Sequence, residues 1–177
     1  MPASVPRYLI ENHGPDQDAI QTAFREAVKV CNDQGIKTIT LVVPSKKAFP
    51  HTALGTLLGE SITKALLRGQ SLPLADEIQL SLESAQTFSE FGSYGMLLGA
   101  YLPEKDQDAL DSVRSADAIV FLPWTEEEGK AWMSTWNPTV LGQSTWQVRR
   151  SALPAEVEEA LQSLTRGINL SSGLDHT

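Results

Sequence analysis

The sequence is poor in cysteine and has no long apolar run, and each shortage excludes a class of protein. Cys31 is the only cysteine in 177 residues, so neither an intrachain disulfide nor a zinc site built on cysteines can form. No apolar stretch approaches the ~20 residues that a membrane-spanning helix requires. The first eight residues also lack the apolar core of a signal peptide. These absences favour a protein of the reducing cytoplasm that has no membrane partner.

Basic residues are scarce as well. The chain carries 14 Lys and Arg against 22 Asp and Glu, which gives a formal net charge of −8. Residues 1–70 have a net charge of +2 and residues 71–177 of −10. Nucleic acid is not expected as a partner, because basic side chains that neutralise phosphates supply most of the affinity for it. The acidic half is expected to form a solvated surface.

Established catalytic motifs are missing too. The histidines His13, His51 and His176 do not form an H-x-x-x-H or H-E-x-x-H pattern, and no nucleophile elbow, P-loop or G-x-G-x-x-G motif occurs. A metal site could be built from His13, Asp16 and Asp18, but helix capping explains the two aspartates more simply. No metal is therefore expected, and the sequence does not identify a cofactor.

What the sequence does contain is an alternation of segments with strand-like and helix-like patterns. Strands are expected at 7–12, 37–44, 77–83, 94–102 and 118–123. Helices are expected at 16–34, 52–68, 103–115, 154–166 and after the capping box that runs from Thr125 to Glu128. Residues 84–93 are expected to form a loop or a short helix, and residues 137–151 to be irregular. This order predicts a three-layer α/β fold, with a mostly parallel sheet between helices on both faces. One strand pair within 77–102 could be antiparallel.

Local residue patterns support these elements. The apolar side chains of segment 16–34 recur at helical spacing and include Cys31, which should face the core; they are Ile20, Ala23, Phe24, Ala27, Val28 and Cys31. Gly55 and Gly59 are expected to allow a helix to pack closely on the sheet. At Gly95 and Gly99, the strand backbone is expected to approach a neighbouring segment closely. We expect one domain over residues 1–168 and a polar tail over 169–177.

Residues 11–59 resemble the opening of small stand-alone proteins related to the pyruvate kinase C-terminal domain. The matching pieces are Asn12 at a strand end, a helix with Phe24 and Val28, the Gly-Ile-Lys-Thr-Ile run at 35–39, and the polar loop at 45–52. The chain departs from that pattern after the second strand, where Ser-Lys-Lys replaces a glycine. The resemblance implies an α/β fold and an effector-binding role rather than catalysis.

Ligands of open parallel sheets bind beyond the carboxyl ends of the strands. The polar and aromatic residues expected at that edge are Glu11, Asn12, His13, Ser45, Lys46, Lys47, His51, Thr52, Glu83, Trp124, Thr125 and residues 126–128.

Two parts of this edge are candidate binding elements. The loop from Ser45 to Thr52 precedes a helix, and its two lysines and His51 favour a phosphate or carboxylate. The alternative is an exposed basic turn with Phe49 in the core. Trp124 could stack on a planar ligand, or it could instead pack against Trp132 or the chain near Trp146.

Three hypotheses of function remain open. The first is a non-catalytic binding or regulatory domain for a small anionic ligand at the carboxyl edge of the sheet. The second is an interaction or assembly module, with a protein partner or a homo-oligomer, that uses the Trp-rich region 124–146. The third is a hydrolase-type enzyme that uses His13, His51 and Glu11, with a carboxylate pair of Glu11 and Glu83 if their strands are adjacent.

Overall fold

The structure is a computed structural model that describes residues 5–11, 13–75, 77–88, 94–111 and 115–142. The elements are β1 (Arg7–Ile10), α1 (Gln17–Gln34), β2 (Thr38–Val43), η1 (Phe49–His51), α2 (Ala53–Leu58), α3 (Glu60–Leu67), β3 (Leu72–Ala75), β4 (Ile78–Ser84), β5 (Met96–Ala100), α4 (Glu104–Asp111), β6 (Ala118–Leu122), α5 (Glu126–Trp136) and β7 (Thr139–Leu141). The expected helix at 154–166, the tail at 169–177, Asn12, Trp146 and His176 lie outside the described residues.

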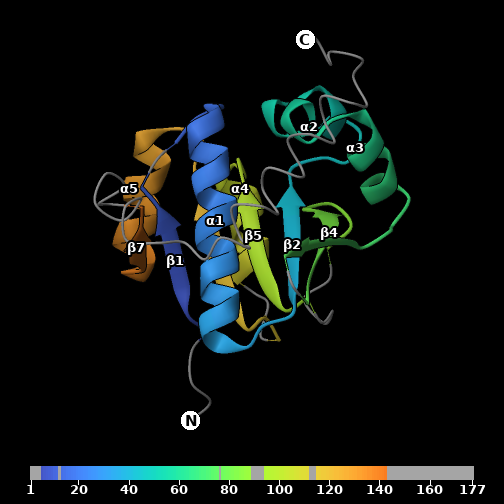
Figure 1. The fold of residues 1–177 in the computed structure, drawn as a ribbon. Coiled ribbons are helices and arrows are strands. Elements are labelled where there is room, and N and C mark those ends of the chain that lie inside the picture. Colours follow the sequence, from blue (N-terminus) through green and yellow to red (C-terminus); the bar gives the residue numbers. More distant parts are fainter. Residues whose placement is uncertain (1–4, 12, 76, 89–93, 112–114, 143–177) are drawn as a thin grey trace.

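The strands form one seven-stranded sheet in the order β3-β4-β2-β5-β6-β1-β7. Every neighbouring pair is parallel except β3 and β4, which are antiparallel. Figure 1 shows α1 crossing one face of the sheet, with α2 and α3 near the carboxyl end of β2. The prediction of a mostly parallel three-layer α/β fold is confirmed.

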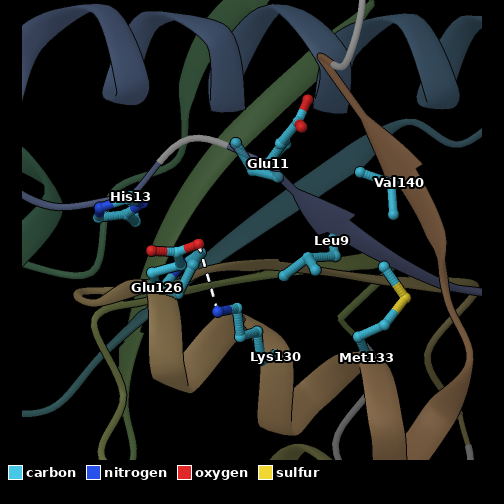
Figure 2. A pocket seen from close by; sticks show the side chains of 10 residues that line it. Leu9, Glu11, His13, Glu126, Lys130, Met133 and Val140 are labelled. Atoms are coloured by element: carbon cyan, nitrogen blue, oxygen red, sulfur yellow. Dashed lines mark ion pairs between the residues drawn. The ribbon is translucent and has the colours of Figure 1, made fainter.

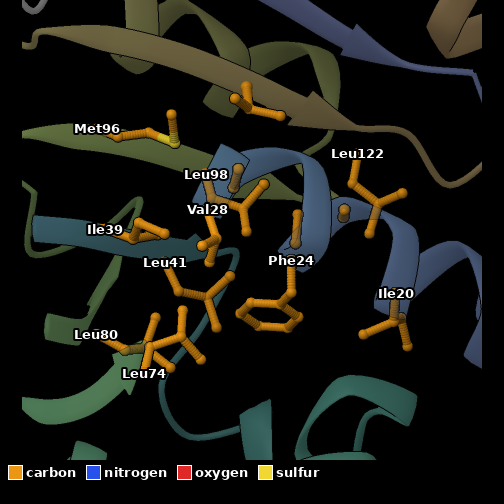
Figure 3. Packing of buried hydrophobic residues seen from close by; sticks show 14 of the residues in the cluster. Ile20, Phe24, Val28, Ile39, Leu41, Leu74, Leu80, Met96, Leu98 and Leu122 are labelled. Carbon is orange, nitrogen blue, oxygen red and sulfur yellow. The ribbon is translucent and has the colours of Figure 1, made fainter. Parts of the chain in front are cut away.

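The larger core lies between α1 and the sheet. The predicted stripe of α1 is buried over its whole length, and Cys31 at its end is completely buried. Side chains at alternate positions of β2, β5 and β6 meet this stripe, as Figure 3 shows for Leu41, Leu98 and Leu122. Because successive strand residues point to opposite faces, the positions between them supply the second core.

The second core covers the opposite face of the sheet. Phe121 from β6 stacks on Trp132 from α5, with ring centroids 4.8 Å apart. Leu9 from β1 and Leu110 from α4 belong to the same buried cluster. Strands that are covered on both faces read as continuous apolar runs, which explains the composition of β5 and β6.

The two edge strands were not anticipated. β3 contains Pro73, which argues against a central strand but is tolerated at an edge. The antiparallel pair is β3–β4. The expectation of an antiparallel pair within 77–102 was wrong, because β4 and β5, the two strands of that segment, each lie parallel to β2. β7 lies in the stretch expected to be irregular, and its three residues are too few for an alternating pattern.

The helix expected at 52–68 is instead broken into α2 and α3, and the short helix η1 precedes it. Gly59 has φ +88°, a left-handed value that favours glycine, and it separates α2 from α3. A Cβ at Gly55 would lie 2.2 Å from the carbonyl oxygen of Phe49, so this glycine allows η1 to pack on α2. The expected contact with the sheet was wrong for Gly55. The close approach to a neighbour that was expected at Gly95 and Gly99 is confirmed, because Gly95 lies against Thr38 of β2 and Gly99 against Leu110 of α4.

Among the residues that the structure describes, no helix has both the length and the apolar character needed to span a membrane.

Candidate functional site

Among the described residues, there are two places in the sheet where the helices that follow two neighbouring strands lie on opposite faces. β1 is followed by α1 on one face, while its neighbour β6 is followed by α5 on the other. β2 is followed by η1, α2 and α3, while its neighbour β5 is followed by α4 on the opposite face. Open α/β sheets bind ligands at such switch points, so both places are candidates.

At the first switch point, backbone contacts join the ends of β1, β5 and β6. The Gly14 N–H donates to the Pro123 carbonyl at 3.1 Å, and the Tyr101 N–H donates to the Leu122 carbonyl at 3.0 Å. The Tyr101 hydroxyl donates to the Gly14 carbonyl at 2.8 Å. These bonds fix the loop after β1 against the loop after β6.

Tyr101 adopts an uncommon conformation in this network. Its φ of +60° lies in the left-handed region, which costs a non-glycine residue about 1 kcal/mol. Burial raises the pKa of Tyr101 to about 12, and the Asp16 carboxylate adds to the increase. The phenol is therefore neutral at physiological pH and acts as a hydrogen-bond donor to Gly14.

A cavity of about 200 Å³ lies beside this switch point, between the carboxyl end of β1, β7 and the first turns of α5. Its lining combines apolar groups with a charged rim: Leu9, Ile10, Glu11, His13, Pro123, Glu126, Gly129, Lys130, Met133 and Val140. Figure 2 shows His13 and the Glu126–Lys130 pair on one side of it, and Val140 and Met133 on the other. An apolar floor with a few polar groups is the usual make-up of a small-molecule pocket.

The start of α5 supplies much of the rim. Thr125 is the N-cap of α5, and its hydroxyl accepts a hydrogen bond from the Glu128 N–H at 3.2 Å, as the predicted capping box requires. Lys130 Nζ lies 3.5 Å from the Glu126 carboxylate, one helical turn earlier. Gly129 is buried, and its missing side chain leaves space beside Pro123 and Leu9.

Trp124 lies at the same edge and remains 47% exposed. Its ring meets Tyr101 edge-on, with centroids 5.1 Å apart. Packing against Trp132 was one alternative expected for Trp124. The ring of Trp132 instead stacks on Phe121 and has Trp136 tilted against it. The indole of Trp124 is therefore held by Tyr101 while much of its surface stays open to solvent.

The second switch point is closed by internal contacts. The Ser45 hydroxyl accepts from the Ala48 N–H, and the Thr52 hydroxyl accepts from the Gly55 N–H at 3.1 Å while donating to the Phe49 carbonyl at 2.7 Å. Phe49 is completely buried, which confirms the core position considered for it. The hydroxyls of Ser45 and Thr52 thus stabilise the turn and cap α2.

The basic side chains of this loop diverge. Lys46 Nζ lies 3.5 Å from the Glu83 carboxylate at the end of neighbouring β4, and Glu83 also accepts from the Thr87 hydroxyl. Lys47 and His51 are exposed. A partner carboxylate beside Lys46 weakens the expected anion site, because it already compensates the charge that would attract the anion.

The residues assigned to an enzyme do not converge. Glu11 and His13 share the cavity, whereas His51 follows β2, which lies three sheet positions from β1, about 14 Å at the usual strand spacing. β4, which carries Glu83, lies one position farther still, so the strands of Glu11 and Glu83 are not adjacent and the condition for their pairing is not met.

Asp16 caps α1, as expected, by accepting a hydrogen bond from the Asp18 N–H at 3.2 Å. Within the described parts of the chain, no group of three or more His, Cys, Asp or Glu residues is arranged to hold a metal ion.

The sequence alone missed several residues of this region. Lys130 and Met133 follow Glu126 at helical spacing, so a helical projection of α5 beyond its cap could have found them. Val140 and Tyr101 could not be found in this way, because their position depends on the order of the strands.

No protein-family model, curated protein or solved structure matches the chain. The resemblance to proteins related to the pyruvate kinase C-terminal domain therefore stays a prediction.

Proposed function

We propose that the protein binds a small molecule in the cavity at the carboxyl end of β1. The observation that carries this proposal is the coincidence of an apolar, charge-rimmed cavity with a topological switch point of the sheet. Its volume of about 200 Å³ is below the roughly 300–1,000 Å³ of sites for drug-sized ligands, so a fragment-sized ligand fits it best.

Two variants of α5 test the site. Met133 lines the cavity and is 36% exposed, so Met133→Trp should reduce the cavity volume without disturbing the core. Ser134→Trp is the matched control, because Ser134 is exposed on the same helix and does not line the cavity. In a fragment screen by ¹H–¹⁵N NMR, compounds that shift the Gly129 and Val140 amides should lose binding to Met133→Trp and keep it with Ser134→Trp. Equal binding to both variants would place the ligand elsewhere.

The anion hypothesis at Lys46 and Lys47 stays a prediction with weaker support, because Glu83 pairs with Lys46. The interaction hypothesis retains one favourable observation, the exposure of the large apolar side chains Trp124 and Met133.

A further inference from the structure

The ligand class can be inferred from the charges around the cavity, an argument that depends on the proposed function above. Glu11, Glu126 and Lys130 are the charged residues of the lining, with His13 beside them. Lys130 already pairs with Glu126. Among the described residues, none forms a hydrogen bond or ion pair with the Glu11 carboxylate, so the lining has one uncompensated negative charge.

The first turn of α5 makes the surroundings more negative. A helix N-terminus by itself attracts anions, but α5 begins with Glu126, Glu127 and Glu128. One carboxylate oxygen of Glu128 is buried and accepts no hydrogen bond. Three carboxylates offset the positive end of the helix dipole, which is equivalent to about half a unit charge.

The floor of the cavity requires an apolar group on the same ligand. Leu9, Pro123, Met133 and Val140 line it with side chains that contain only carbon and sulfur heavy atoms. A bare metal ion would leave this surface unoccupied, and no cluster of three metal-binding side chains occurs among the described residues. The net charge of −8 would also raise the local concentration of cations.

We propose that the cavity takes a small organic cation, an ammonium group on an apolar body, with the charge against Glu11 and the body over Leu9, Met133 and Val140.

Three probes of one shape and different charge test this class: benzylamine, benzyl alcohol and benzoate. Dissociation constants come from NMR titration of the intact protein, followed at the Gly129 and Val140 amides. We expect benzylamine to bind about fivefold more tightly than the other two, the scale of one partly exposed ion pair. Glu11→Gln should weaken benzylamine about fivefold and leave benzyl alcohol unchanged. Glu127→Gln is the matched control, since it removes the same charge from an exposed position outside the cavity.

The outcomes separate the two proposals. The cation class would be overturned if benzyl alcohol or benzoate bound as tightly as benzylamine. It would also be overturned if Glu11→Gln and Glu127→Gln had equal effects on benzylamine binding. In both cases the cavity would remain a binding site. If none of the three probes shifts the cavity amides at high millimolar concentration, both the class and the proposed function are rejected.

Discussion

Both switch points of the sheet contain residues that the sequence predicted to bind a ligand. The two differ in whether their polar groups already have partners within the protein. After β2, the hydroxyls of Ser45 and Thr52 bond within the loop, and Lys46 pairs with Glu83. After β1, Glu11 remains without a partner among the described residues, beside a cavity. Within the described residues, the end of β1 thus combines an unpaired carboxylate with a neighbouring cavity, whereas Lys46 after β2 and Glu83 at the end of β4 pair with each other.

The largest expected effect concerns the tightly packed region after β2. Gly55→Ala would place a Cβ 2.2 Å from the Phe49 carbonyl oxygen, which is backbone and cannot move cheaply. We expect a loss of about 3 kcal/mol in the free energy of unfolding, measured by urea denaturation.

Gly129→Ala is the control at the other switch point. Its Cβ would have no neighbour closer than 3.5 Å, an ordinary contact, and alanine favours a helix interior by about 1 kcal/mol over glycine. This variant should be no less stable than the parent protein. Equal destabilisation of both variants would contradict the contrast between a packed and an open switch point.

A second prediction concerns alkaline pH. Burial, with a contribution from Asp117, raises the pKa of Cys31 to about 12, and that of Tyr101 is also raised to about 12. The unfolded chain releases these protons near pH 8.5 and 10. Their contribution to stability is therefore complete below about pH 8.5 and is lost as the pH rises toward 12.

Urea unfolding at pH 7.5 and pH 10 measures this loss, which should be about 2 kcal/mol and come mainly from Cys31. Cys31→Ala should reduce the dependence on pH, and Tyr101→Phe should change it little below pH 10. An unchanged slope in Cys31→Ala would show that other groups control alkaline stability.

The smallest expected effect is at Lys46. Its ion pair with Glu83 is about one-third exposed on each side, so Lys46→Ala should cost about 0.5 kcal/mol and less in high salt. Lys47→Ala should cost nothing measurable in the same denaturation assay. If the two variants behave alike, Lys46 is not held by Glu83 and the anion hypothesis regains support.

Local patterns were sufficient for most elements. The α1 stripe, its Asp16 cap and its end at Gly35 were all predicted, because side chains within one helix interact at fixed spacing. The N-cap at Thr125 was confirmed for the same reason. The break at Gly59 was missed, since Leu54, Leu58 and Leu66 fit one helix as well as two.

By itself, the sequence determined that the sheet is mostly parallel and which segments form α1, α4, α5 and the central strands, but not the edge strands β3 and β7. Only the tertiary structure decided the strand order, and with it the neighbours of each strand end. Side-chain periodicity depends on residues a few positions apart, whereas strand order depends on packing between segments far apart in the chain. Val140 and Glu11 lie about 130 residues apart along the chain, yet the pairing of β7 with β1 brings them to one cavity.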